Sequence, residues 1–147
     1  MATLKISDLS VGDWVQVILN KCDYGEPDTF KAKVLTVVNN SVGVGYDNSG
    51  IVMSALVEDL QPIPITAEML EKNGWSTDGM YAFLCIDEHL HLEYYYHEHR
   101  LRKYFCGVDE WQNHAKVNDI TFSAHCYSVH QLQHALRLAG VNKEINL

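Results

Sequence analysis

The sequence lacks the segments that carry a chain to or across a membrane. No apolar run approaches the roughly 20 residues of a membrane-spanning helix. The opening residues, MATLKISDLS, contain no apolar stretch of the signal-peptide type. The four cysteines, Cys22, Cys85, Cys106 and Cys126, are scattered without close pairs and are therefore expected as reduced thiols. These absences predict a cytoplasmic protein that does not enter membranes.

Basic residues are also few. The chain has 11 Lys and Arg against 19 Asp and Glu, which gives a formal net charge of −8. Residues 1–65 carry 4 basic and 8 acidic groups and residues 66–147 carry 7 and 11, so each part has a net charge of −4. Nucleic-acid affinity comes largely from Lys and Arg that displace counterions. The charge balance therefore disfavours non-specific binding to nucleic acid.

Motifs of common catalytic sites are missing as well. The sequence has no phosphate-binding loop, no carboxylate pair at a readable spacing, no convincing set of metal ligands and no internal repeat. With 47% apolar and 20% charged residues, its composition is that of a soluble globular protein. A chain of 147 residues can form one core or two small modules. We therefore expect a protein without cofactor, metal or catalytic residues.

Residues 1–61 are predicted to form a small β-barrel module. Short strand patterns separated by turn signals are typical of such barrels, and they occur here at 14–19, 30–38, 42–46 and 51–54. Trp14 and Phe30 are expected to fill the barrel core. Tyr24, in a polar loop, is the candidate for an exposed contact.

Residues 62–147 are predicted to form a second module, docked on the first through the extended Pro62–Pro64 joint. A short helix over 67–72 is followed by strand patterns at 81–86, 89–96, 99–106 and 117–124. The first of these strands, YAFLCI, is apolar on both sides and is expected to be buried on both. A helix that follows an antiparallel meander packs on one face of the sheet. The predicted fold class is α+β.

The C-terminal helix has the clearest signals in the sequence. Ser128 and Gln131 have the spacing of a capping box, and Gly140 stands where a left-handed C-cap is expected. The helical period places an apolar side toward the sheet and a polar side toward solvent. The inward residues are Val129, Leu132, Ala135, Leu136 and Ala139, and the outward ones are His130, Gln133, His134 and Arg137.

Two stretches of the chain resemble parts of known proteins. LSVGDWVQV, leading through a hairpin to LVEDLQPIPITAEMLEKNGW, is similar to the opening of many small uncharacterised proteins of Gram-negative gut bacteria, their phages and mobile elements. The ending, YSVHQLQHALRLAGVNKEINL, resembles the close of the same proteins. This resemblance covers well over half of the chain and implies a phage or mobile-element origin, but no activity. Residues 1–60 also resemble an SH3-like or KOW/Tudor-like barrel in strand lengths and turns, although KOW-type nucleic-acid binders are usually basic.

His130 and His134 lie four residues apart on the C-terminal helix, a spacing that can chelate a metal. The motif His-Gln-Leu-Gln-His has glutamine where a zinc protease needs its glutamate base, which excludes that chemistry. The plain interpretation is that both histidines belong to the polar side of an amphipathic helix, where they remain candidates for binding.

A hydrolase or metal site at the start of this helix, around Cys126, His130 and His134, is a third interpretation. A thiol near a helix N-terminus is favoured as thiolate, yet the sequence offers no orienting third group and no oxyanion donor. A zinc set of Cys106, His125, Cys126 and His130 is opposed by two ligands adjacent on a strand, which point to opposite faces. A buried structural thiol is favoured instead.

The strands 89–96 and 99–106 carry a mixed polar and aromatic face. Leu101 and Phe105 are expected to point inward. The outward candidate binding residues are His91, Tyr95, Arg100, Arg102 and Tyr104. Arg and Tyr are enriched at protein interface hot spots, and the same residues can stack on single-stranded nucleic acid. Because the chain is acidic, a protein partner ranks above nucleic acid.

The sequence therefore predicts a non-enzymatic interaction protein that binds a protein partner or a second copy of itself. The alternative is a nucleic-acid-binding module that uses the barrel or the face between Arg100 and Tyr104.

Overall fold

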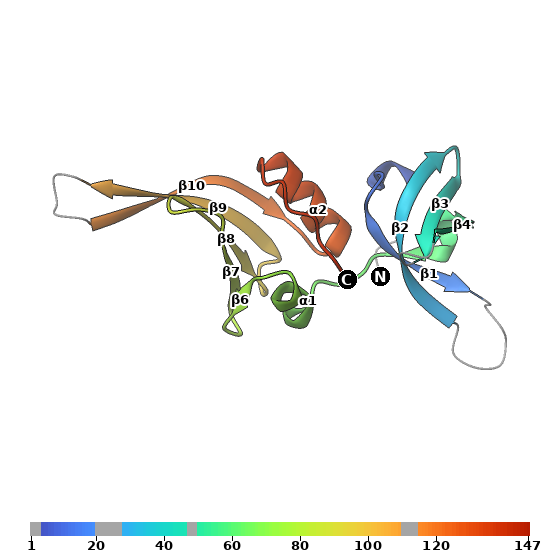
Figure 1. Ribbon diagram of the computed structural model, residues 1–147, viewed down its shortest axis with the longest axis horizontal. Coiled ribbons are helices and arrows are strands. Elements are labelled where there is room, and N and C mark those ends of the chain that lie inside the picture. Colours follow the sequence, from blue (N-terminus) through green and yellow to red (C-terminus); the bar gives the residue numbers. More distant parts are fainter. Residues whose placement is uncertain (1–3, 20–27, 47–49, 110–114) are drawn as a thin grey trace. The chain divides into compact units, whose positions relative to one another are not determined.

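The computed structural model describes residues 4–19, 28–46, 50–109 and 115–147, which form two compact units (Figure 1). The first unit comprises Met1–Pro64 with Ser128–His130, and the second Ile65–Tyr127 with Gln131–Leu147. Each unit contains one antiparallel sheet, and the α-helices of the described residues are α1 and α2. The predicted α+β class is confirmed.

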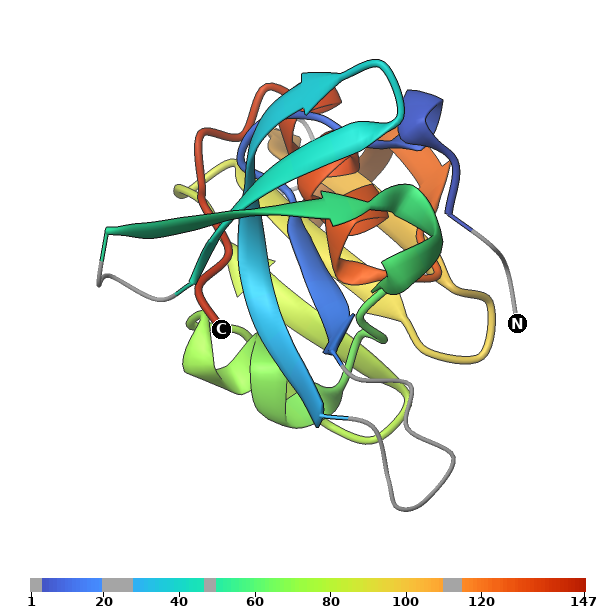
Figure 2. The same cartoon turned by 90° about the vertical axis from the view of Figure 1, so that its right-hand side faces the viewer.

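The sheet of the first unit has the strand order β4-β3-β2-β1-β5 (Figure 2). The four leading strands form a meander, and the 3₁₀ turn Val57–Asp59 returns the chain so that β5 pairs with β1. In the described part of the chain β4 and β5 are not paired with each other, so the sheet does not close. The strands are β1 (Trp14–Leu19), β2 (Asp28–Val38), β3 (Ser41–Tyr46), β4 (Ile51–Leu56) and β5 (Leu60–Gln61).

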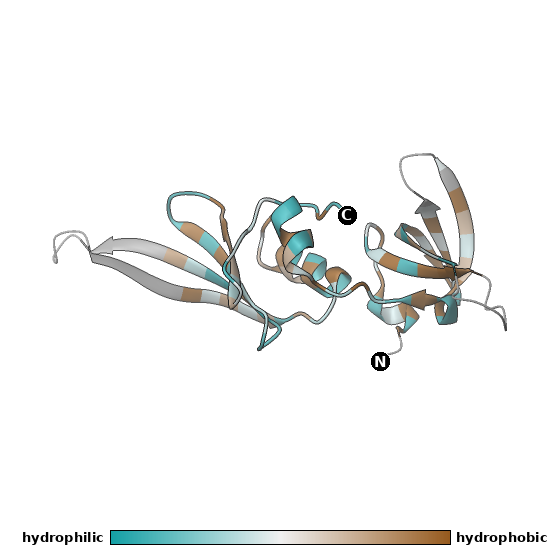
Figure 3. Ribbon diagram, turned by 90° about the horizontal axis from the view of Figure 1, so that it is seen from below, coloured by the Kyte–Doolittle hydropathy of each residue, from teal (hydrophilic) through white to brown (hydrophobic). Residues whose placement is uncertain are grey.

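The core of this unit follows the alternation of side chains along its strands (Figure 3). Val15 and Val17 of β1 are fully buried, so Trp14 lies on the opposite face. There Trp14 is half-buried, with the Lys33 ammonium 5.2 Å from the ring centroid. The expectation that Trp14 fills the core is therefore wrong, while Phe30 packs against the core as a partly buried residue.

The sheet of the second unit is an uninterrupted antiparallel meander with the order β10-β9-β8-β7-β6. Its last two strands form a long hairpin that extends beyond α2 (Figure 1). The sequence pattern does not predict β6, which has two residues. The strands are β6 (Ser76–Thr77), β7 (Tyr81–Cys85), β8 (Leu90–Tyr95), β9 (Arg100–Asp109) and β10 (Ala115–His125).

Both helices lie on the same side of this sheet (Figure 1). The first, α1 (Ala67–Lys72), begins where the Thr66 hydroxyl accepts a hydrogen bond from Met69 N, at 3.2 Å. The second, α2 (Val129–Leu138), ends in a Schellman motif as expected. Gly140 has a φ of 75°, and Val141 N donates to Leu136 O at 2.9 Å.

The inward side of α2 is wider than its sequence pattern indicates. Val129, Leu132 and Leu136 are buried as predicted, but His130 and Gln133 are 3% and 2% exposed. The prediction that these two side chains point to solvent is wrong. His130 Nδ1 lies 2.9 Å from the Ser128 hydroxyl, and Gln133 is covered by the C-terminal tail that it binds.

The face of the sheet beneath the helices is apolar. Ala82 and Leu84 of β7, Leu92 and Tyr94 of β8 and Leu101 of β9 are buried there. Burial alternates along β7, so the expectation that this strand is buried on both sides is wrong. Phe105 is 43% exposed rather than buried.

No helix in the described ranges is long and apolar enough to cross a membrane.

Candidate functional site

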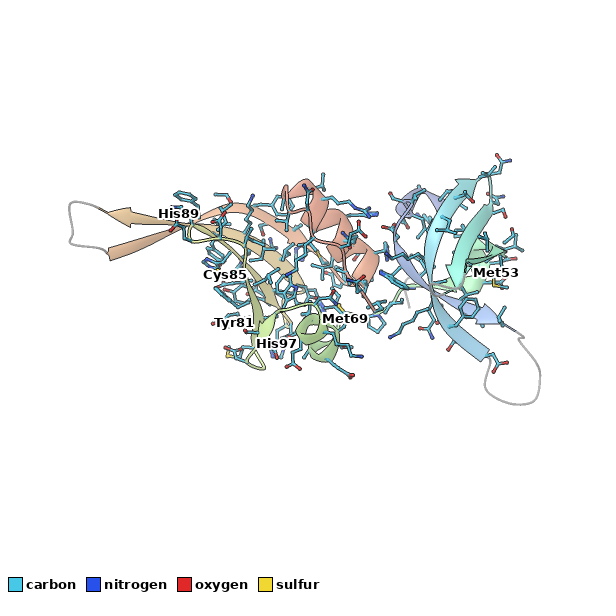
Figure 4. The ribbon with its side chains drawn as sticks, viewed as in Figure 1. Met53, Met69, Tyr81, Cys85, His89 and His97 are labelled. Atoms are coloured by element: carbon cyan, nitrogen blue, oxygen red, sulfur yellow. The ribbon has the colours of Figure 1, made fainter. Side chains whose placement is uncertain are left out.

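In the sheet of the second unit, α1 and α2 lie over one face (Figure 1). The opposite face carries the candidate site, and none of the described helices of this unit covers it. Cross-strand register brings Tyr81, Tyr95 and Arg100 into one row, and Phe83, Glu93 and Arg102 into the next. Tyr81 also shares β7 with Cys85 (Figure 4). We call this surface the polar–aromatic face and define it as Tyr81, Phe83, His91, Glu93, Tyr95, Arg100, Arg102 and Tyr104.

Three rings form a ladder across β7, β8 and β9. The His91 ring lies between Phe83, at a centroid distance of 4.9 Å, and Tyr104, at 5.0 Å and an interplanar angle of 10°. These distances match the spacing of neighbouring strands. The rings therefore stand upright on the sheet, and both faces of the His91 ring are covered by its neighbours.

Tyr95 is enclosed in the same way. Tyr81 stacks on it at a centroid distance of 5.7 Å, and the Arg102 guanidinium carbon lies 4.7 Å from its centroid. Its hydroxyl donates a hydrogen bond to Glu93 and lies 3.4 Å from the Tyr104 hydroxyl. The inner aromatic side chains are thus held in place by one another before any partner binds.

The two arginines of the face are paired within it. Glu98, in the turn between β8 and β9, lies 2.9 Å from Arg102 Nη2 and 3.8 Å from Arg100 Nε. Arg100 also donates to the Ser123 hydroxyl at 2.8 Å and lies 2.7 Å from His125 Nε2. The guanidinium groups are therefore oriented and partly neutralised, while about a quarter to a third of each remains exposed.

Strand β10 adds residues at the margin of the face. Ile120 pairs with Tyr104 and is 55% exposed, which places an apolar group beside the ring ladder. Just after the end of β10, Tyr127 is 59% exposed, and its ring centroid lies 4.9 Å from that of His99 and 6.1 Å from that of His125. The face therefore ends in exposed apolar and aromatic groups.

The surroundings of the face strengthen the ordinary charge state of two residues. Burial raises the pKa of Tyr95, and hydrogen bonds with Glu93 and Tyr104 raise it further. The pKa of Arg102 is also raised, mainly by its hydrogen bond with Tyr104. Tyr95 is thus a neutral hydrogen-bonding group and Arg102 a permanent cation at physiological pH.

The structure brings five of the sequence-derived candidates together and separates the others from them. His91, Tyr95, Arg100, Arg102 and Tyr104 all lie on the polar–aromatic face. His130 and His134 belong to α2, on the other side of the sheet, where His130 is buried and His134 half-buried. Tyr24 lies outside the described residues.

The surroundings of Cys126, just before α2, do not favour a nucleophilic thiolate. The Cys126 thiol is fully buried, and its Sγ lies 3.9 Å from Ala124 O and 3.8 Å from Gln131 O. Burial raises the pKa of this thiol to about 12. It is therefore protonated at neutral pH, the opposite of an activated cysteine.

A metal site at the same place finds no geometric support either. Over the described residues, no group of three His, Cys, Asp or Glu side chains could hold a metal ion. The side chain of Cys106, part of the zinc set considered above, is outside the described side chains.

Sequence reasoning missed Tyr81 and Phe83 as members of the face and Ile120 at its margin. Tyr81 and Phe83 were assigned to a doubly buried strand because the whole segment is apolar. The available signal was the size alternation within YAFLC, in which large aromatic residues alternate with Ala82 and Leu84. The large residues lie on the face without helices.

Comparison of the chain with protein-family models, with curated protein sequences and with solved structures gives no match.

Proposed function

We propose that this chain is a non-enzymatic interaction protein that binds a protein partner through the polar–aromatic face. The observation that carries the proposal is a pre-ordered cluster of Tyr95, Arg102 and Tyr104 on a sheet face that the helices of its unit leave uncovered. Tyr and Arg are the residue types enriched at interface hot spots. Their mutual contacts reduce the conformational entropy that a partner would have to remove on binding.

The chemistry of the face suits a polypeptide. Upright rings expose their edges and hydroxyl groups rather than their planes, and Ile120 provides an apolar contact next to them. The paired arginines can exchange Glu98 for a carboxylate of a partner, or hold both. The face combines aromatic and apolar contacts with charged groups, and these residue types occur together in ordinary protein interfaces.

Nucleic-acid binding is the second candidate, because Arg and Tyr alternate on the face. Single-stranded nucleic acid binds by stacking its bases on free ring planes. Here the planes of His91 and Tyr95 are covered on both sides, and Glu98 partly neutralises both arginines. These contacts favour the protein partner.

Charge reversal at Arg102 tests the proposal. Tagged wild-type protein, Arg102→Glu and the control Arg137→Glu are used to capture proteins from nuclease-treated extracts, and each captured protein is then purified and titrated by calorimetry. Arg137 is also an exposed arginine with an acidic neighbour, Glu144 at 3.9 Å, but it lies on α2. We expect Arg102→Glu to weaken binding at least about tenfold, about 1.4 kcal/mol, and Arg137→Glu to leave it unchanged.

The same purified proteins separate the two candidate functions. Titration of labelled single-stranded DNA and RNA at low salt is expected to give no change in fluorescence anisotropy. Binding that weakens with added salt and with Arg102→Glu would show that the face recognises nucleic acid instead.

We also propose that the first unit is an SH3-like barrel. Its strand order and the 3₁₀ turn before β5 support this assignment. A cytoplasmic location and a phage or mobile-element origin are part of the same proposal. They rest on the sequence: the cysteines scattered without close pairs, and the resemblance of LSVGDWVQV and of the C-terminal segment described above.

A further inference from the structure

The edge strands of the two sheets differ in how well they are protected against pairing with another chain. An edge strand presents unpaired N–H and C=O groups, and proteins block them with short strands, charges or β-bulges. β5 and β6 have two residues each. β10 is long, but it carries Lys116 and Asp119 and has a register shift between Ile120 and Phe122. Each of these three edges has at least one protective feature.

The fourth edge, β4, has none of these features. Its six residues, IVMSAL, include no charge and no proline, and they pair with β3 in unbroken register. Val52 and Leu56 are 63% and 50% exposed, whereas Met53 packs against the core of the first unit. Within the described ranges the strand therefore offers both a row of backbone groups not paired with another strand and exposed apolar side chains.

The outer face next to β4 extends this apolar surface. Across β3, Leu56 is in line with Ser41 and Val38, and Val38 is 61% exposed. Gly45 of β3 lies opposite Val52. Because Gly45 has no side chain, Leu35 of β2 covers it, with the Leu35 Cδ1 atom 3.0 Å from the position that a Cβ on Gly45 would occupy. A strand added at β4 would therefore continue a surface that is already apolar.

We propose that β4 is the self-association edge of this protein and pairs antiparallel with β4 of a second copy. The chain carries a net charge of −8, so two copies repel one another over most of their surface. The residues of β4 itself carry no charge, so pairing along 51–56 places no charged side chains opposite each other. Antiparallel pairing of a strand with itself also satisfies two-fold symmetry, the commonest symmetry of homodimers.

The proposed dimer is independent of the polar–aromatic face. A single pair of six-residue strands buries less than the roughly 1,200 Å² of a stable interface, so we expect a weak dimer, in the micromolar to millimolar range. The pairing hydrogen bonds form between backbone groups. With the two-fold axis at Ser54, Val52 of one copy lies opposite Leu56 of the other.

Sedimentation velocity over a concentration series, combined with hydrogen exchange, tests this proposal. For the wild-type full-length chain we expect the mass to rise from monomer toward dimer, with concentration-dependent protection of residues 51–56. Val52→Lys places a cation on the edge and should weaken the dimer at least about tenfold. Met80→Lys, at a 69% exposed methionine of the second unit, adds the same charge and should change nothing.

A chain that stays monomeric throughout the series would overturn the proposal. So would a dimer whose new protection falls on 90–109 or 115–125 rather than on 51–56, since that result would assign self-association to the second sheet. The hydrogen-exchange pattern of the wild type decides the matter even if Val52→Lys does not fold.

Discussion

Tyr94 and Tyr96 show that the contribution of a buried hydroxyl to stability depends on whether it has a hydrogen-bond partner. Tyr94 is fully buried, and its hydroxyl donates a hydrogen bond to Cys126 O at 2.8 Å. The hydroxyl oxygen of Tyr96 is also buried, but among the described residues it has no hydrogen-bond partner. Removing a buried partner costs the desolvation of the group left behind, whereas removing an unpaired hydroxyl costs nothing. The two residues should therefore respond in opposite ways to the same substitution.

We predict that Tyr94→Phe lowers the free energy of unfolding by about 1–2 kcal/mol, because Cys126 O loses its donor in a buried place. Tyr96→Phe is predicted to be neutral or stabilising. Urea unfolding of the wild type and both variants, followed by near-ultraviolet circular dichroism, measures the difference. Equal losses for the two variants would contradict this assignment.

At the scale of the elements, α2 is stabilised by hydrogen bonds from side chains that are not part of its apolar side. Lys103 of β9 donates to Ala139 O at 2.7 Å and binds a carbonyl at the C-terminal end of the helix, where a cation is favourable. Gln133 binds the C-terminal tail through two hydrogen bonds, from Ile145 N at 2.9 Å and to Lys143 O at 3.3 Å. The tail is also held to the end of α1, where Asn146 N donates to Asn73 Oδ1 at 2.7 Å.

Replacing Gln133 should release this tail. We predict that Gln133→Ala costs about 2 kcal/mol of stability, since a buried backbone amide and a part-buried backbone carbonyl lose their partner. The Ile145 amide should then exchange faster with solvent. Gln131→Ala is the matched control: Gln131 is exposed and accepts a bond from Tyr127 N at 2.7 Å, so its removal should cost less than about 1 kcal/mol. Similar losses of stability for both variants would contradict the claim that Gln133 holds the C-terminal tail in place.

Elements with local signals could be predicted from the sequence. Residues 67–72 were assigned as a helix with Thr66 as its cap, and the structure agrees. The stop of α2 at Gly140 was also correct. The predicted cap at the start of α2 was only partly correct. The Gln131 side chain accepts a hydrogen bond from Tyr127 N, and the Ser128 hydroxyl lies beside His130 and does not form the expected capping box.

What could not be predicted depends on contacts between distant residues. The burial of Gln133 requires residues 143–145 to fold over the helix, which no helical period reveals. The ring ladder requires the registers of β7, β8 and β9 to place Phe83, His91 and Tyr104 side by side. Alternation within one strand identifies the candidates on a face but not the neighbours that cover their rings.

At the scale of the whole molecule, several groups hold their protons more tightly in the folded state. The pKa values of Tyr94, Tyr95 and Tyr96 are raised, chiefly by burial, and that of Cys126 is raised from 9.0 to about 12. In the unfolded chain these groups lose their protons from about pH 9 upward. Each therefore contributes stability that is complete below that pH and is lost as the pH rises.

We predict that the urea midpoint of the protein falls steadily between about pH 9 and about pH 11. The variant Cys126→Ala should show a shallower decline, because one of the groups that binds its proton more tightly when folded is gone. A midpoint that stays constant or rises over this range would mean that these groups ionise equally well in the folded state.

The chain as a whole combines an acidic surface with one oriented cluster of aromatic and cationic side chains. That cluster lies on a sheet face that neither described helix of its own unit covers, and its rings and charges are already arranged by mutual contacts. The face is therefore the feature from which we infer a protein partner.

Hydrogen exchange of the wild-type chain, alone and saturated with a purified partner, tests this inference most directly. The account predicts that the amides protected on binding lie in 90–109 and 115–125, and that Arg102→Glu abolishes this protection while Arg137→Glu preserves it. Protection confined to residues 4–61, or unchanged by Arg102→Glu, would contradict it.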